Sequence, residues 1–600
     1  MQPKVNNSRA RASRRGCGRF IRVLEIAFVS TLVLCWSGLA GAQHTTGTLR
    51  GQVSDQTGAT VAGGNVAVSN EATGVVQTTA TTSAGTYEFP SVLPGTYTIT
   101  VDAKSFKRYV KKGIGVLANQ DNVADARLDI GASSETVEVV AGTAEVQTTS
   151  SDLTNNFSAQ DVANLPSSAG VLNGSPLNLA ILAPNVVATP GGSQGVGGAV
   201  GGTRPRDNNF SVDGVDDNNL GTTGNNSTVI PDAVAEFALQ TNQFSAEYGH
   251  SAGGQFSLIT KTGTNKLHGS GEWYAQNRNF NSLDNLTKAQ IQTDQTLKIP
   301  GSLLTKPPYD DNRFGGTIGG PIIKDKFFFF GAYEYTTIHG SGPTTLLSTA
   351  PTSAGLSMLE GIAASPAVNA ALAAFPVAPS NNGGTLAVNG TSIPVGSLAV
   401  VAPNFQREHD AQFNTDYTWG RHQLGTRFTL NQEKFIVPAS IPLPVWNQNE
   451  PVNNRKIALT DTWTARNNVV NDIRLQYSYY FLGLLDPCTA GVTCQPDITV
   501  GDLFTGNTAG VSDNQHQKQN SYQVRDTLSW VHGKHTFKFG GEYNHFIYPQ
   551  FFLSRSVGDY EYETTADFIN DVVPTSRVLR GAGSGYFLGT ESLMAGFCPG

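Results

Sequence analysis

The stretch Asp472-Ile473-Arg474-Leu475-Gln476-Tyr477-Ser478-Tyr479-Tyr480-Phe481 is the most informative part of this chain. Apolar and aromatic side chains occupy its odd-numbered positions, and polar side chains occupy nearly all of the even-numbered ones. A strand has this pattern when one of its faces meets an apolar phase and the other meets polar groups. In a membrane barrel the two phases are lipid and a wet lumen, and every backbone group pairs with a neighbouring strand. The stretch therefore predicts a membrane strand.

The same period of two recurs in 412–419, 423–431 and 536–544. An ordinary secreted β-sandwich also alternates, so the pattern alone leaves that alternative open. Strands of about 10 residues, rich in Tyr, Phe and Trp and joined by connections of very different lengths, favour the barrel. We therefore predict an all-β chain in which residues 266–600 form part of an outer-membrane antiparallel β-barrel, with about ten strands.

The first 42 residues have the features of a signal peptide. A basic leader precedes a short apolar stretch at 26–36, and Ala40-Gly41-Ala42 gives the small-x-small pattern before a cleavage point at Gln43. No later segment approaches the length of a transmembrane helix. We expect an exported protein.

The amino-acid composition narrows the possible classes of protein further. Only 14% of the residues are charged, Gly is abundant at 65 residues, and the formal net charge of −7 offers no basic patch, so we expect no nucleic-acid partner. Cys488 and Cys494 lie close together in a loop-like stretch, and a disulfide between them is expected in an oxidising compartment. Cys598 is left over near the end of the sequence, which suggests that the chain continues.

Residues 46–130 predict a small β-sandwich, because short strands are separated by Gly- and Pro-containing turns at even spacing. The run SAGTYEFP at 83–90 leads into LPGTYTITV at 93–101. This arrangement resembles the carboxypeptidase regulatory-like domain, which has a carbohydrate-binding-like fold. The ten histidines include no H-x-x-E or H-E-x-x-H pair that could hold zinc, so we expect no enzyme activity, no metal site and no cofactor.

Residues 131–265 change character. An extended run follows the sandwich, then come a helix start at 161–165, a Gly-rich tract at 190–203, RPRDNNFSVDGVD at 204–216 and GGQFSLITKTGTN at 253–265. The blocks NRFGGTIGGPI at 312–322 and KFFFFGAYE at 326–334 follow in order. Together they resemble the plug and first barrel strands of TonB-dependent receptors of the Oar-like branch.

The resemblance implies an outer-membrane receptor that binds a scarce nutrient, a siderophore, an oligosaccharide or a similar solute, and is gated by its plug. Its partners would be TonB in the periplasm, outer-membrane lipid and the solute. TonB engages receptors by strand addition, which suits an exposed, β-prone segment. The segment that we assign to this contact consists of Glu135, Thr136, Val137, Glu138, Val139, Val140 and Ala141. The alternative is that this segment is simply the last strand of the sandwich.

Strand number adds a constraint. A barrel of about ten strands has no room for a folded plug, whereas plugged barrels have about 22 strands. We therefore expect the sequence to be the N-terminal portion of a longer receptor. A second functional class stays open, an adhesion or envelope-structural protein that binds polysaccharide without transport.

Three smaller features have ordinary explanations. The stretch 343–403 lacks the strand pattern and predicts a long external loop with a short helix near 356–375. The G-x-S-x-G match at 191–195 lies in a Gly-rich tract, which argues against a nucleophile. Asp213, Asp216 and Asp217 could suggest calcium, but a polar turn is favoured because a hard cation needs further oxygens at fixed offsets.

Overall fold

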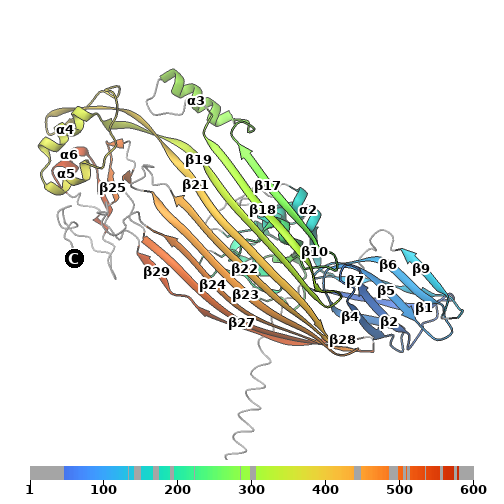
Figure 1. The fold of residues 1–600 in the computed structure, drawn as a ribbon. Coiled ribbons are helices and arrows are strands. Elements are labelled where there is room, and N and C mark those ends of the chain that lie inside the picture. Colours follow the sequence, from blue (N-terminus) through green and yellow to red (C-terminus); the bar gives the residue numbers. More distant parts are fainter. Residues whose placement is uncertain are drawn as a thin grey trace, which may run out of the picture.

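The computed structural model describes residues 46–579, except 133, 141–150, 166–174, 189–194, 222, 250, 284, 298–305, 438–446, 486–496, 505–507, 510–513, 534, 554–558 and 573–577. Figure 1 shows three parts in chain order: a small sandwich, a central domain and one long, tilted sheet. None of the helices in these ranges is both long and apolar enough to cross a bilayer.

The sandwich consists of β1 (Gly47–Asp55), β2 (Asn65–Asn70), β3 (Val76–Ala80), β4 (Thr86–Val92), β5 (Gly95–Asp102), β6 (Arg108–Val116), β7 (Asp121–Val123), β8 (Ala126–Leu128) and β9 (Thr136–Val140). One sheet has the order β4-β1-β7, with β8 also paired to β1, and the other has the order β3-β2-β5-β6-β9. Alternate side chains of both sheets, such as Leu49, Val66 and Ile99, are fully buried between them. The alternation predicted from the sequence therefore forms the core.

The central domain occupies the predicted plug segment. Its five-stranded sheet has the order β10-β15-β16-β13-β14. The strands are β10 (Leu153–Ser158), β13 (Asn209–Val212), β14 (Val215–Asp216), β15 (Val234–Asn242) and β16 (Gln255–Thr260), with α2 (Ala159–Asn164) after β10. Phe210, Phe237 and Phe256 pack together at its centre. Ser158 and Asp161 form a capping box at the start of α2, which explains the predicted helix start.

The long sheet is antiparallel throughout, with the order β17-β18-β19-β21-β22-β23-β24-β27-β28. Its strands are β17 (His268–Asn277), β18 (Tyr309–Ile323), β19 (Phe327–Pro351), β21 (Thr391–Trp419), β22 (His422–Val437), β23 (Gln448–Arg466), β24 (Val469–Leu484), β27 (Asn514–His532) and β28 (His535–Ile547). β20 (Thr385–Val388) pairs with β21, and β29 (Gln550–Leu553) pairs with β27. At one end the strands join through tight turns, such as Gly420 and Arg421, and at the other through long connections. Short periplasmic turns and long external loops are typical of outer-membrane barrels.

The two faces of the long sheet differ as the sequence predicted. Leu475, Tyr477 and Phe539 are exposed on the outer face, whereas Arg474 and Gln476 are buried against the central domain. Outward aromatic and aliphatic side chains suit lipid, and inward polar ones suit a lumen. Lys538 faces inward as expected, but it contacts Glu247 of the central domain at 2.8 Å and not open water.

One expectation about the external side is wrong. We predicted a loop with one short helix in 343–403, but β19 runs to Pro351, β21 begins at Thr391, and two helices lie between them, α4 (Ser353–Ile362) and α5 (Pro366–Leu372). This segment packs with β25 (Asp497–Val500), β30 (Asp559–Tyr562) and α6 (Thr565–Ile569) around one buried apolar cluster. These segments, far apart in sequence, bury one another's apolar side chains, which no local pattern reveals. We call this assembly the external unit (Figure 1).

The sandwich lies against the tight-turn end of the long sheet. Asn265 donates through Nδ2 to Thr73 O at 2.6 Å and to Asp325 Oδ1 at 2.7 Å, which ties the β2–β3 turn to the β18–β19 turn. Thr79 Oγ1 donates to Asn467 O at 3.0 Å in the β23–β24 turn. The sandwich therefore sits on the periplasmic side of the predicted barrel.

Candidate functional site: the interface between plug and barrel

The turn between β13 and β14 places the central domain against the long sheet. Asp213 and Gly214 form this turn with φ angles of 51° and 73°, in the left-handed region that glycine tolerates best. The Asp213 carboxylate accepts hydrogen bonds from Thr260 N at 2.9 Å and Thr260 Oγ1 at 2.8 Å, which fixes the turn to β16. The turn therefore projects from a rigid sheet.

Two arginines of the long sheet hold this turn through its backbone. Arg474 Nη1 donates to Asp213 O at 2.7 Å, and Arg525 Nη1 donates to Gly214 O at 2.9 Å. The two arginines are direct register partners on β24 and β27, so their side chains reach consecutive carbonyls. Arg427 of β22 approaches the Asp213 carboxylate at 3.9 Å. Together they form a cationic cradle around one turn.

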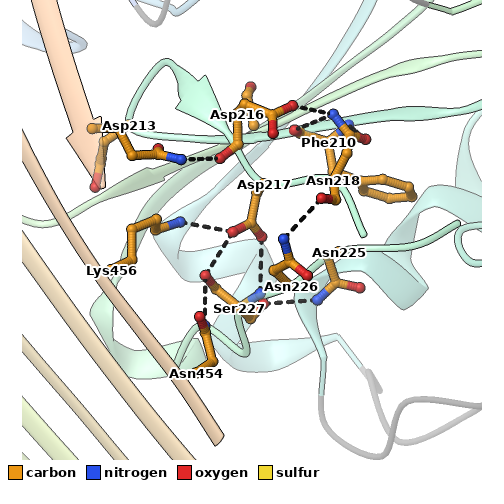
Figure 2. A network of polar contacts seen from close by, with 12 residues as sticks. Phe210, Asp213, Asp216, Asp217, Asn218, Asn225, Asn226, Ser227, Asn454 and Lys456 are labelled. Atoms are coloured by element: carbon orange, nitrogen blue, oxygen red, sulfur yellow. Dashed lines mark hydrogen bonds and ion pairs between the residues drawn. The ribbon is translucent and has the colours of Figure 1, made fainter. Parts of the chain in front are cut away.

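A buried ion pair lies beside the cradle (Figure 2). Lys456 Nζ of β23 contacts Asp217 Oδ1 at 2.8 Å, and the two side chains are 4% and 1% exposed. Asp217 also accepts hydrogen bonds from Ser227 N at 3.1 Å and Ser227 Oγ at 2.6 Å. The carboxylate is thus fully engaged, which a buried charge requires.

Side-chain amides of the long sheet make most of the remaining contacts. Asn431 bonds to both backbone groups of Thr228, accepting from N at 3.2 Å and donating to O at 2.8 Å. Further contacts of this kind join Asn454 to Ser227, Asn414 to Thr260 and Lys261, Gln476 and Gln523 to Asp216, and Gln519 to Asn218 and Leu220. These bonds are neutral and mostly reach the backbone, so most of the contact surface is polar.

Asp216 is a third carboxyl group in this region. Its Oδ1 accepts from Asn218 Nδ2 at 2.5 Å, and Figure 2 shows both residues above Asp217. Burial is the main cause that raises the pKa of Asp216 to about 7; the hydrogen bond from Asn218 opposes this rise, and the nearby Glu542 and Asp217 contribute to it. Asp216 therefore changes charge near neutral pH, unlike an ordinary aspartate.

A polar cavity of about 520 Å³ lies where the sandwich, the central domain and β27–β28 meet. Its lining includes Arg50 and Glu88 of the sandwich, Glu247 of the central domain and Lys538 of β28. Thr536 Oγ1 donates to Glu88 Oε2 at 2.7 Å, and burial raises the pKa of Glu88. The cavity is thus bordered by all three parts at the periplasmic end.

The residues singled out from the sequence have different outcomes. The segment assigned to TonB contains strand β9, which pairs in parallel with β6 at the edge of the sandwich. Its last residue, Ala141, lies outside the described residues. The same is true of Cys488, Cys494, the signal peptide and most of the G-x-S-x-G match. Asp213, Asp216 and Asp217 do come together, but Asp213 faces Arg427 and Asp217 faces Lys456 of the barrel wall. No group of three or more His, Cys, Asp or Glu side chains in the described ranges is arranged to hold a metal ion.

Comparisons with known proteins agree with this architecture. A family model described as outer membrane beta barrel domain matches residues 259–590, more than half of the chain. The chain belongs to this outer-membrane β-barrel family. Residues 48–129 match the carboxypeptidase regulatory-like domain. The long sheet is therefore a barrel wall in the outer membrane, and we refer to the central domain, which lies against the inner face of this wall, as the plug.

One curated relative is the TonB-dependent transporter Oar of Myxococcus xanthus, 28% identical over 264 residues, which cover 43% of this chain and 23% of that protein. The matched region thus spans less than a quarter of the relative. The resemblance to Oar-like TonB-dependent receptors is confirmed. Solved structures that are similar include the outer membrane transporter YddB of Escherichia coli (TM-score 0.45, 12% identity, 68% of this chain and 50% of that chain). Another is the siderophore receptor PirA of Pseudomonas aeruginosa (TM-score 0.30, 11% identity, 68% and 58%).

The contacts that sequence reasoning missed are the barrel cations. Lys456, Arg474 and Arg525 stand on the lumen face of their strands; Arg474 also forms an ion pair with Asp472 of the same strand at 2.7 Å. A charged side chain at an inward-facing position was a detectable signal. Its partner, however, lies hundreds of positions away and could not be assigned from one sequence.

Proposed function

We propose that this protein is a TonB-dependent outer-membrane transporter for a scarce solute, with the plug as its gate. The observation that supports this most is the contact surface between plug and barrel. It consists largely of amide-to-backbone hydrogen bonds, each worth only about 0.5–1.5 kcal/mol because water can replace either partner. A plug held in this way closes the lumen and can still be displaced.

The remaining features fit the same proposal. The outer membrane holds no nucleotide or ion gradient, so displacement needs force from a periplasmic partner, which we take to be TonB. Strand β9 is the segment that we propose for its contact, since strand addition requires an accessible strand edge. A solute released beside the plug would enter the polar cavity at the junction with the sandwich.

Deleting the plug strands tests the gate. Cells that produce the protein without residues 153–260 should become sensitive to vancomycin, which is normally too large for the outer membrane, because an unplugged lumen conducts it. Cells producing the intact protein at the same level are the control, and heat-modifiable migration on gels checks that the barrel has assembled. An assembled, unplugged barrel that leaves vancomycin resistance unchanged would contradict the gate.

A second function, adhesion to polysaccharide, draws support from the external unit. This unit has its own apolar core, with fully buried Leu359, Val368 and Phe568, and so is a folded structure and not a bare loop. Adhesion through it would be independent of the plug. Deletion of 153–260 should therefore leave binding of cells to polysaccharide unchanged if adhesion is the main role.

A further inference from the structure

Within the described residues, strand β9 pairs along one of its two edges. It pairs in parallel with β6 from Arg108–Thr136 to Lys112–Val140, and Arg108 N donates to Glu135 O at 2.8 Å. In an extended strand, the N–H and C=O of one residue point to the same side, and successive residues alternate sides. The groups of Val137 and Val139 therefore face β6, and those of Thr136, Glu138 and Val140 face the opposite edge.

No described strand covers that opposite edge. β9 is the last strand in the order β3-β2-β5-β6-β9, and no strand in the described ranges pairs beyond it. The edge strand at the other end, β3, contacts the barrel turn at Asn467, so the β9 edge points away from the barrel into the periplasm. Figure 1 shows β9 at the far tip of the sandwich. Val140 is 73% exposed there.

An open edge of this kind invites pairing with another chain. Soluble proteins usually block such edges with charges, bulges, proline or a covering segment. Here the residues of β9 are β-branched apart from Glu138, and the acidic side chains are already bound at the seam with β6. Lys107 contacts Glu135 at 2.6 Å, and Lys112 contacts Glu138 at 2.7 Å. These pairs hold β9 in the extended conformation and leave its outer edge unprotected.

We propose that the sandwich is a docking platform that presents β9 to the energising partner. The partner's strand adds to the outer edge, through the backbone groups of Thr136, Glu138 and Val140, while β9 remains paired with β6. The identity of the partner rests on the proposed function, in which it is TonB. Because β9 is already ordered on the sandwich, binding does not carry the entropy cost of extending a flexible segment.

Two proline substitutions, each removing an N–H group from a different edge of β9, test which edge the partner uses. Glu138→Pro removes an N–H that points outward, and Val137→Pro removes one that points to β6. Purified TonB C-terminal domain is titrated against the purified chain in detergent. Glu138→Pro should weaken binding at least tenfold and Val137→Pro no more than threefold. Glu138→Gln, which keeps the backbone donor, should bind like the unaltered chain. The reverse order for the two prolines would overturn the proposal.

A disulfide lock tests whether β9 stays on the sandwich. Val110 and Glu138 are register partners, so cysteines at both positions can join β6 to β9. The oxidised variant should bind the TonB domain within threefold of the reduced one. A tenfold loss on oxidation that reductant reverses would show that β9 must leave β6, which overturns the platform but keeps the TonB contact. Absence of binding by the unaltered chain would overturn the contact as well.

Discussion

The ion pair between Lys456 and Asp217 gives the sharpest test of the plug–barrel interface. Lys456→Met keeps the length and apolar stem of the side chain and removes only the charge. Asp217 then remains 1% exposed with no cation at 2.8 Å, and it keeps the two hydrogen bonds from Ser227. The variant therefore leaves the Asp217 carboxylate buried without a cation beside it.

The expected cost follows from that environment. Removing one partner of a buried ion pair costs about 3–5 kcal/mol. The Ser227 bonds persist and continue to satisfy the carboxylate, so we expect the lower end of that range. A cost of about 3 kcal/mol raises the equilibrium constant for local opening of the plug roughly a hundredfold, since 1.4 kcal/mol corresponds to a factor of ten.

Hydrogen exchange measures this opening directly. Backbone N–H groups of β13 and β14 in the purified protein should exchange roughly a hundredfold faster in Lys456→Met. A matched control is Lys538→Met, which breaks another plug–barrel pair, to Glu247, whose side chains are 29% and 18% exposed. Because this pair is partly exposed to solvent, we expect it to contribute no more than about 1 kcal/mol, and exchange should rise less than about fivefold.

Two results would refute this account. Equal effects of Lys456→Met and Lys538→Met would mean that burial does not govern the strength of the contact. No change in either variant would mean that the plug opens elsewhere first. A double variant, Asp217→Asn with Lys456→Met, separates charge from packing: it leaves no unpaired charge and should protect β13 and β14 better than Lys456→Met alone.

Three further outcomes are expected. Gly214→Ala should destabilise the plug by about 1–2 kcal/mol, because φ is 73° there, and a lower melting temperature in calorimetry would show it; an unchanged value would mean that the turn relaxes. Asp216 has a raised pKa, so its contribution to stability is present at low pH and is lost as pH rises from its ordinary 3.8 through about 7. The plug should thus show higher protection factors, corrected for the intrinsic pH dependence of amide exchange, at pH 5 than at pH 8, and Asp216→Asn should flatten that difference; an equally steep profile would assign it to another group. Phe539→Arg on the outer face should cost about 2–4 kcal/mol if the site lies near the bilayer midplane, as measured by unfolding from bilayers, with Phe539→Leu as the nearly silent control. Similar costs for the two would place this face away from lipid.

The faces of the barrel strands could be predicted because they depend on local order alone. A period of two determines which side chains share a face, and this assignment needs no knowledge of distant segments. This rule correctly places Leu475 and Phe539 on the outer face and Arg474 on the inner face. The same applies to the sandwich, in which Leu49 and Ile99 fill the core.

The plug contacts could not be predicted, because they depend on how remote segments meet. Asp213, Asp216 and Asp217 were recognised as a polar cluster, and a turn was favoured over calcium. The turn is present, but the cluster's partners, Lys456 and Arg474, are more than two hundred residues away. The external unit could not be predicted for the same reason, since α4 and α6 share one core although they are similarly far apart in the sequence.

Strand β9 shows why one segment can satisfy two predictions. The sequence allowed either a TonB contact or a last strand of the sandwich, and these were treated as alternatives. The structure places it in the sandwich with one edge open. A strand has two edges, so pairing at one does not exclude pairing at the other, and the alternatives are compatible.

The chemistry of the plug contacts bears on the proposed gate, which has to be both closed and movable. Apolar contact between plug and barrel is small, a cluster that includes Ile230 and Phe330, whereas amide contacts cover much of the described wall. Apolar burial would gain stability in proportion to area and resist displacement in water. Amide bonds exchange with water at little net cost, so a moving plug can break them one after another. The buried pair of Lys456 with Asp217 does not exchange in this way, because separating the two groups leaves each charge buried without its partner. We infer that the amides make the interface releasable, and that the ion pair and the two arginines on the Asp213–Gly214 turn define the closed position.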